Sequence, residues 1–196
     1  MTPFVSVPRR GPSSYHMQNP ALVFDRLGLR RGSVLLDLGC GPGDYALQAA
    51  EIVGTTGRVH AMDLSESLLR WVAEEAVQRD LTNVSAQVGD MRARLPFDDE
   101  TVDVCLIAQV LHALPDRAVC LPSVFGEVFR VLRARGTLAI IECKKEDACF
   151  GPPLSARLGP EDLIPVAETR GFAAASNHDL GVSYLLLLSA VWDRER

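Results

Sequence analysis

The chain has 196 residues, 47% of them hydrophobic, and a formal net charge of −5. This length predicts a single domain, and the apolar fraction excludes intrinsic disorder. The longest apolar run, Tyr184–Leu188, is far shorter than the roughly 18 residues that a membrane-spanning helix needs. The first 20 residues contain no apolar stretch typical of a secretory signal, so we expect a cytoplasmic protein.

The charge is unevenly distributed along the chain. Residues 1–33 carry five Arg and one Asp, residues 34–100 carry five basic and twelve acidic residues, and residues 101–196 carry ten basic and twelve acidic residues. An acidic body argues against nucleic acid as a partner, because binding phosphates needs a basic face. The five cysteines form no CxxC pair, which predicts free thiols and no metal site.

Short apolar strands alternate with helices along the chain. A helix is expected within residues 1–33, in an arm that covers the site of the domain formed by residues 34–196. Strands are expected at 34–37, 58–63, 84–88, 102–108, 137–142, 173–178 and 183–192. Helices are expected at 44–53, from Ser65 to about 79, at 116–132 and at 160–170. This alternation predicts an α/β fold, with a largely parallel sheet covered on both faces by helices.

The end of the chain departs from that alternation. Only Asp179–Val182 separates the last two expected strands, and this segment has the length of a hairpin. The last strand should therefore run antiparallel to the others, in a seven-stranded mixed sheet.

The strongest motif is the glycine-rich segment that follows the first strand, Asp37-Leu-Gly-Cys-Gly-Pro-Gly-Asp44. Glycines at such a turn let a ligand approach the bare backbone. A dinucleotide site needs a third glycine where this chain has Asp44, and a carboxylate there would face a pyrophosphate. Acids around the loop instead suit a ligand that carries cationic groups, such as S-adenosylmethionine.

Two further acids follow later strands. Asp63 ends the second strand, where a carboxylate can accept hydrogen bonds from ribose hydroxyls. Asp90 follows the third strand, where it can accept a bond from an adenine amine while Met91 packs on the ring. Acids at the ends of three successive strands predict one ligand crevice.

These segments resemble, in order, the motifs of class I S-adenosylmethionine-dependent methyltransferases. The motifs are DLGCGPG, AMDLS, GDM, LPFDDETVDV and FRVLRARGTLAIIE, at residues 37–43, 61–65, 89–91, 95–104 and 129–142. The likeness is greatest to small bacterial methyltransferases of type 11, grouped with the ubiquinone and menaquinone C-methyltransferases. It implies a Rossmann-like sheet in the order 3-2-1-4-5-7-6 with an antiparallel last strand.

The resemblance also implies roles for individual residues. The loop, with Asp37, Gly39, Cys40, Gly41 and Gly43, would hold the methionine part of S-adenosylmethionine. Asp63 would hold the ribose, Leu64 and Met91 the adenine faces, and Asp90 the adenine amine. Ala108 and Gln109 would border the ammonium and the methyl group. The partner implied is a small-molecule acceptor, with no nucleic acid or membrane and with a homodimer as an option.

Three features of the sequence disfavour particular acceptors. The chain lacks the N-terminal cysteine pair of arsenite methyltransferases, and it is shorter than the quinone enzymes. The N/D-P-P-Y/F signature of amino methylation is also absent, because residues 108–111 read Ala-Gln-Val-Leu.

Candidate catalytic residues lie around the position expected for the methyl group. His112 follows the fourth strand and is a candidate general base, because imidazole can take up a proton near neutral pH. Tyr15 and His16 lie in the arm that would close over the site. The segment after the fifth strand, which contains Glu142, Cys143, Lys144 and Cys149, is where the acceptor would bind.

The leading hypothesis is therefore a small-molecule methyltransferase that works by in-line displacement. One alternative is a catalytically weak binding module or subunit that holds S-adenosylmethionine. A less favoured alternative is an NAD-linked oxidoreductase, against which Asp44 and the antiparallel ending both count.

Overall fold

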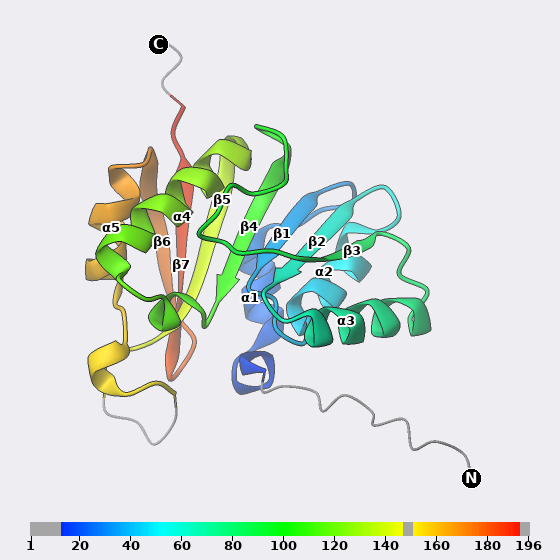
Figure 1. Cartoon of the computed structure of the whole chain (residues 1–196), viewed down its shortest axis with the longest axis horizontal. Coiled ribbons are helices and arrows are strands. Elements are labelled where there is room, and N and C mark those ends of the chain that lie inside the picture. The colour runs from blue at the N-terminus through cyan, green and yellow to red at the C-terminus, as the bar shows by residue number, and fades with distance from the viewer. Residues whose placement is uncertain (1–12, 147–150, 193–196) are drawn as a thin grey trace.

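A seven-stranded mixed sheet forms the centre of the molecule, in the order β3-β2-β1-β4-β5-β7-β6 (Figure 1). The computed structural model describes residues 13–146 and 151–192. The strands are β1 (Val34–Leu38), β2 (Arg58–Asp63), β3 (Val84–Val88), β4 (Val102–Ala108), β5 (Leu132–Cys143), β6 (Phe172–Asp179) and β7 (Ser183–Ala190). The fold class and strand order predicted from the sequence are confirmed.

In the described part of the chain, five α-helices and three short 3-10 helices precede or connect the strands. The α-helices are α1 (Pro20–Leu27), α2 (Asp44–Val53), α3 (Glu66–Gln78), α4 (Arg117–Val131) and α5 (Pro160–Glu168). The 3-10 helices are η1 (Ser14–Met17), η2 (Leu111–Ala113) and η3 (Leu154–Ala156). Among the described residues, none of these helices is long and apolar enough to cross a membrane.

The direction of the strands agrees with the hairpin predicted at the end of the chain. Strands β1 to β5 pair in parallel, whereas β7 pairs antiparallel with both β5 and β6. Since β7 runs backwards, its first residue, Ser183, lies opposite Cys143 at the end of β5. The start of β7 therefore shares an edge of the sheet with the carboxyl ends of the parallel strands.

The fifth strand begins earlier than the sequence predicts. Helix α4 ends at Val131 and β5 follows at once from Leu132, rather than from Thr137. Leu132 is buried and pairs with Val102, and the pairing then shifts register before Thr137. The residues between, 133–135, are exposed, with Arg135 in the left-handed conformation. A bulge of this kind interrupts the apolar alternation, so the segment looks like a turn in the sequence.

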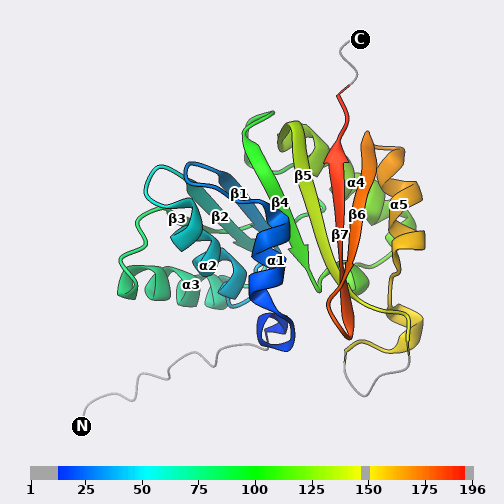
Figure 2. The same cartoon turned by 180° about the vertical axis from the view of Figure 1, so that it is seen from behind.

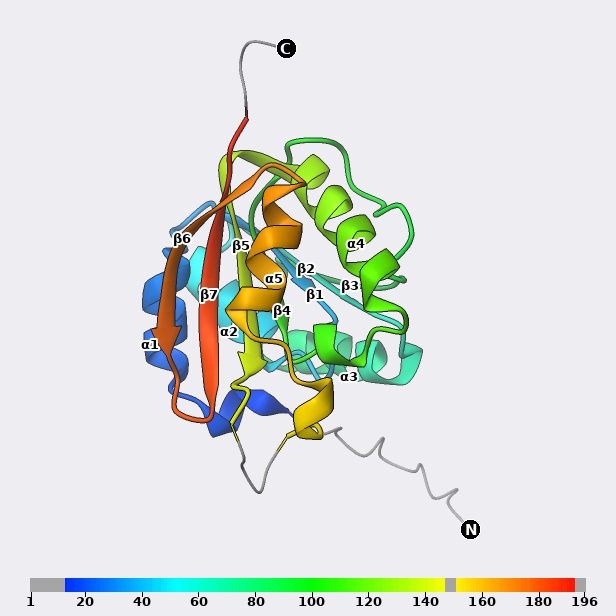
Figure 3. The ribbon, with the colours of Figure 1, turned by 90° about the vertical axis from the view of Figure 1, so that its left-hand side faces the viewer.

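Two apolar cores lie on opposite faces of the sheet. One packs α1, α2 and α3 against the sheet, and the other packs α4 and α5 (Figures 2 and 3). Val23 and Leu27 of α1 belong to the first core and are at most 4% exposed. The helix expected within the arm is thus part of the packed domain. The strands between the cores are apolar on both sides, as a buried parallel sheet requires.

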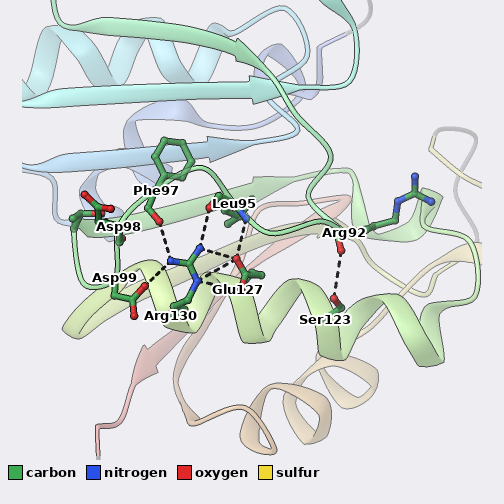
Figure 4. Close-up of polar contacts among 9 residues, drawn as sticks. Arg92, Leu95, Phe97, Asp98, Asp99, Ser123, Glu127 and Arg130 are labelled. Carbon is green, nitrogen blue, oxygen red and sulfur yellow. Dashed lines mark hydrogen bonds and ion pairs between the residues drawn. The ribbon is translucent and has the colours of Figure 1, made fainter.

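A clamp around Arg130 of α4 holds the long connection between β3 and β4 (Figure 4). Its guanidinium donates to the carbonyls of Leu95 and Phe97 at 2.9 and 2.8 Å, and it pairs with Asp99 and Glu127, both at 2.7 Å. Glu127 in turn accepts the backbone N–H of Leu95 at 2.9 Å. These bonds satisfy backbone groups of a segment that has no strand partner, and so they fix its path.

The same connection is held to α4 at a second point, nearer the end of β3. The Ser123 hydroxyl donates to the carbonyl of Arg92 at 3.4 Å (Figure 4). Helix α4, which packs on the other face of the sheet from α2 and α3, therefore positions the residues that follow β3.

Candidate functional site

The glycine-rich loop between β1 and α2 forms the floor of the site. Gly39, Gly41 and Gly43 all have positive φ, between 54° and 81°, which other residues adopt only with strain. A Cβ on Gly39 would lie 2.7 Å from the Val110 side chain, whereas a Cβ on Gly41 would meet nothing within 4 Å. Gly41 thus presents bare backbone to open space, where a ligand can approach.

Asp63, at the end of β2, is tied to the loop through its carboxylate. One oxygen accepts the backbone N–H of Gly41 and the other accepts that of Ser65, both at 2.9 Å. Each carboxylate oxygen has a second acceptor position. Asp63 therefore fixes the loop and can still accept hydrogen bonds from a ligand.

Two neighbouring cavities meet at Asp63, and Gly39 and Val110 line both as well. The first, of about 280 Å³, is the apolar lobe; its walls include Leu38, Leu64, Met91, Ala113 and Leu114. The second, of about 220 Å³, is the acidic lobe; its walls include Asp37, Asp44, Tyr45, Ala108 and Gln109. Together they form a crevice that is apolar at one end and acidic at the other.

Asp37 is the most unusual group in the acidic lobe. Its side chain is buried, and its Oδ2 has no hydrogen-bond partner among the described residues. Burial is the main cause that raises the pKa of this carboxyl, to about 7. A hydrogen bond from the Ala46 backbone lowers the pKa, and the negative charges of Asp63 and Asp44 raise it. A buried, unpaired carboxylate is costly, so this oxygen marks a place for a donor or cation supplied by a ligand.

Asp44 lies in the same lobe, at the first position of α2. Its side chain is 9% exposed and lies 3.9 Å from Nε2 of His16. Three acids therefore line one small cavity at a helix N-terminus. This charge opposes a pyrophosphate, which would need donors and a neutral or positive surface there.

Asp90 is engaged in the structure by a neighbour in its own loop. Both carboxylate oxygens bond the guanidinium of Arg92, at 2.7 to 3.1 Å, and the Arg92 backbone N–H donates as well. Hydrogen bonds from Arg92 lower the pKa of Asp90. Asp90 and Met91 both line the apolar lobe, but this carboxylate must share or exchange its Arg92 bonds to bind a ligand amine.

Gln109 follows β4 and joins the acidic lobe to the end of β5. Its backbone is left-handed, with φ of 58°, and its N–H donates to the Ile141 carbonyl at 2.7 Å. The side-chain amide donates to Ser183 at 3.0 Å and accepts from the Cys143 thiol at 3.3 Å. These bonds link three strands at the edge of the crevice.

His112 lies in η2 and pairs with Glu142 at the end of β5. The imidazole Nδ1 is 2.8 Å from Oε2 of Glu142, and the His112 backbone N–H donates to Oε1 at 3.3 Å. The sequence singled out both residues, but it did not predict that they meet. No periodic or local signal connects positions 30 residues apart.

The arm residues Tyr15 and His16 pack beside α2 rather than lining a lobe. Tyr15 stacks edge-on against Tyr45, and its hydroxyl donates to Gln48 at 3.4 Å. Ser13 and Ser14, which the sequence did not single out, line the acidic lobe instead. Tyr15 and His16 thus position the arm, and the hydroxyl-bearing residues before them reach the site.

The other residues after β5 that the sequence predicted near the acceptor are Cys143, Lys144 and Cys149. Cys143 is buried behind Gln109, and Lys144 pairs with Asp179 at 2.8 Å. Cys149 lies outside the described residues. Within 13–146 and 151–192, no group of three or more metal-ligating side chains could hold a metal ion.

The family model for the methyltransferase domain matches residues 29–160 of this chain. A curated relative, the demethylmenaquinone methyltransferase of Listeria monocytogenes serotype 4a, is 34% identical over 114 residues, which are 58% of this chain and 46% of the relative. The enzyme of the same name from Lactococcus lactis is 34% identical over 62% of this chain and 46% of its own length. The chain spans about half the length of these relatives.

Among solved structures, a SAM-dependent methyltransferase from Aquifex aeolicus superposes with a TM-score of 0.82 at 27% identity, covering 93% of this chain and 95% of its own. The [4+2]-cyclase SpnF superposes with a TM-score of 0.74 at 20% identity, over 88% of this chain and 80% of its own. The second match shows the fold alone, and that protein is named for a different reaction. The reaction must therefore be argued from the site.

Proposed function

This chain belongs to the methyltransferase domain family, within the class I S-adenosylmethionine-dependent methyltransferases, and from that premise we propose that it methylates a small-molecule acceptor. The carrying observation is the crevice that is acidic at one end and apolar at the other, with Asp63 where the ends meet. S-adenosylmethionine has the matching order of groups: an ammonium and a sulfonium, then a ribose diol, then a flat purine.

The acidic lobe fits the methionine part of that molecule. Asp37 offers an unpartnered buried oxygen, and Gly39, Cys40 and Gly41 line the same lobe, with open space at Gly41. A Cβ on Gly39 or Gly43 would instead meet the side chain of Val110 or Val72, at 2.7 and 2.5 Å. A cationic group placed there satisfies the orphan oxygen and offsets the repulsion among the three acids of the lobe. Ala108 and Gln109 form the opposite wall, towards the acceptor side.

The apolar lobe fits the adenosine part. Asp63 has free acceptor positions for the two ribose hydroxyls, at the place where the lobes join. Leu64, which is 65% exposed, and Met91 provide apolar surface for the two faces of the purine. Asp90 would accept from the adenine amine once it shares its bonds with Arg92.

The sulfonium of S-adenosylmethionine supplies an activated methyl carbon when it is bound, so the protein has to orient rather than activate the donor. The rigid loop and the bonds of Gln109 do this by fixing one wall of the crevice. Orienting two reactants in this way can contribute several kcal/mol towards the barrier.

The acceptor is proposed as a small molecule because the curated relatives are named for demethylmenaquinone. The quinone itself is not carried over, since the chain spans about half the length of those relatives. NAD-linked chemistry is the weaker candidate, because Asp44 lies where a pyrophosphate would bind.

Transfer of label tests the proposal directly. The chain is incubated with methyl-labelled S-adenosylmethionine and a bacterial metabolite extract, and labelled products are separated by chromatography. We expect at least one labelled product with the native chain, little with Asp63→Ala, and full labelling with Asp98→Ala, whose side chain is exposed away from both lobes. An extract that stays unlabelled with the native chain contradicts the proposed function.

A further inference from the structure

A partly buried group of polar side chains lies at the end of the sheet next to the crevice. It consists of Gln109, His112, Glu142, Cys143 and Ser183, and it links the ends of β4 and β5 to the start of β7. No role in holding the donor explains His112 or Glu142, because neither lines the apolar or the acidic lobe.

Glu142 is completely buried, and it contacts His112 through both of its carboxyl oxygens. Its residue exposure is 0%, and both of its oxygens accept bonds from residue 112, one from the backbone and one from Nδ1. With Glu142 as a carboxylate, which can only accept, the 2.8 Å contact is a hydrogen bond donated by Nδ1–H. The neutral imidazole then has its lone pair at Nε2.

The His112 imidazole has one edge against Glu142 and the other edge accessible. Its side chain is 19% exposed, and because the buried Glu142 holds Nδ1, the edge that carries Nε2 is the accessible one. Val110 lines both lobes, and Ala113 lines the apolar lobe. His112 therefore stands in the chain between residues that line the crevice.

The backbone around η2 is strained at both ends. Gln109 and Asp116 have positive φ, at 58° and 34°, although neither is glycine. Such conformations are strained for residues other than glycine and persist where surrounding contacts impose them. At Gln109 these contacts are the bonds to Ile141, Ser183 and Cys143. The cluster thus fixes the segment that carries His112.

We infer that His112 is the general base for the acceptor, that Glu142 is its positioning residue, and that the acceptor is one whose attacking atom carries a proton. This inference rests on the proposed function. In the step, an electron pair of the acceptor forms a bond to the methyl carbon, and the carbon–sulfur bond breaks with its electrons going to sulfur. The pair is a lone pair on oxygen or nitrogen, or the pair that a C–H bond releases when the base takes its proton. Nε2 takes the proton of the attacking atom, which leaves a neutral methylated product and an imidazolium beside the Glu142 carboxylate.

This chemistry selects a class of acceptor. A hydroxyl, an amide N–H or an acidic C–H loses a proton on methylation and needs a base near neutral pH. A tertiary amine or a thioether does not, because its product keeps a positive charge. The inference therefore predicts an acceptor with a removable proton on oxygen, nitrogen or carbon.

The imidazole tautomer tests the geometry without any acceptor. Long-range proton–nitrogen NMR spectra of the uniformly ¹⁵N-labelled chain report which ring nitrogen carries the proton, and the His112→Gln spectrum identifies the His112 signals. We expect the Nδ1–H form in the native chain at pH 8, and a shift towards Nε2–H in Glu142→Leu. If that variant does not fold, the native spectrum alone decides, because an Nε2–H form there overturns the inference.

Kinetics with the acceptor found by labelling test the role of the base. Loss of a general base should lower kcat by about 100-fold or more in His112→Gln, and by about 10-fold or more in Glu142→Gln. Affinity for S-adenosylmethionine should stay within twofold in both variants. The control is His178→Gln, in β6, where the ring bonds Ser176 at 2.9 Å; it should leave both quantities unchanged.

The outcomes separate this inference from the proposed function. A labelled product that is a quaternary ammonium or a sulfonium overturns the base while methyl transfer stands. Unchanged kcat in His112→Gln does the same. An extract that stays unlabelled contradicts the proposed function, and the inference falls with it, whatever tautomer is observed.

Discussion

The crevice proposed for the donor and the edge of the sheet proposed to meet the acceptor are built in different ways. The crevice is formed by short segments at the ends of β1 to β4 together with Ser13 and Ser14, and the groups proposed to hold a ligand are loop backbone and the carboxylates of Asp37, Asp63 and Asp90. The acceptor edge is formed by side chains that meet from distant positions, such as Gln109 with Ser183 and His112 with Glu142.

The difference shows which parts of such a site a sequence can reveal. A loop motif fixes its own geometry, because glycines at positive φ and an adjacent helix N-terminus determine the turn. Long-range pairs depend on sheet order and register, which no local pattern encodes. The donor is therefore easier to infer than the acceptor.

Asp37 gives the largest expected effect on the free energy of unfolding. It tests whether burying this carboxylate destabilises the folded chain. Its pKa is raised to about 7 by burial, so the native chain keeps a proton that the unfolded chain loses near pH 4. The free energy of unfolding should therefore fall as the pH rises through this interval, by about 3 kcal/mol between pH 5 and pH 8. Urea unfolding of the native chain and of Asp37→Asn at both pH values measures the difference.

That dependence should be absent in Asp37→Asn, because an amide carries no charge to bury. The variant Asp98→Asn provides the control, since an exposed carboxylate should leave the native pH dependence in place. Parallel curves for the native chain and Asp37→Asn would show that burying this carboxylate does not destabilise the folded chain.

Replacing Arg130 tests how strongly the clamp holds the connection between β3 and β4, which carries part of the crevice wall. Replacing it with Ala leaves the Leu95 and Phe97 carbonyls and Glu127 without their partner, which should lower the free energy of unfolding by about 2–3 kcal/mol. Arg133→Ala is the matched control, because its pair with Asp103 is largely exposed and should contribute under about 1 kcal/mol. Equal losses in thermal unfolding would contradict the clamp.

Asp63 tests the junction of the two lobes. Loss of two charge-assisted bonds to the ribose should weaken binding of S-adenosylmethionine by roughly 100-fold in Asp63→Ala. Asp63→Asn retains one acceptor oxygen and should lose roughly 10-fold. Calorimetric titration measures both, and a thermal melt confirms that the variants fold. Native affinity in Asp63→Ala would remove this residue from the ligand site.

Gly41 gives the smallest effect and separates strain from ligand contact. Gly41→Ala and Gly28→Ala each place a Cβ on a residue with positive φ where nothing lies within 4 Å. Both should cost about 1–2 kcal/mol of stability. Only Gly41→Ala should also weaken binding of S-adenosylmethionine, by about 10-fold, because its Cβ faces the acidic lobe. Equal affinities for the two variants would contradict the placement of the ligand.

Much of the fold follows from the sequence, and less of the site does. The seven strands, their alternation with helices and the antiparallel ending follow from apolar runs and from the short segment Asp179–Val182. The start of β5 does not, because a bulge hides the pairing of Leu132 with Val102. Nor do the Asp90–Arg92 pair and the His112–Glu142 contact, since side-chain pairing depends on the folded geometry.

The central claim is that the crevice binds S-adenosylmethionine, and calorimetric titration of the native chain tests it most directly. Separate titrations use S-adenosylmethionine, its demethylated product and NADH. The account predicts binding of the first two in the micromolar range and none of NADH, whose pyrophosphate would meet Asp44. Binding of NADH without binding of S-adenosylmethionine would contradict it.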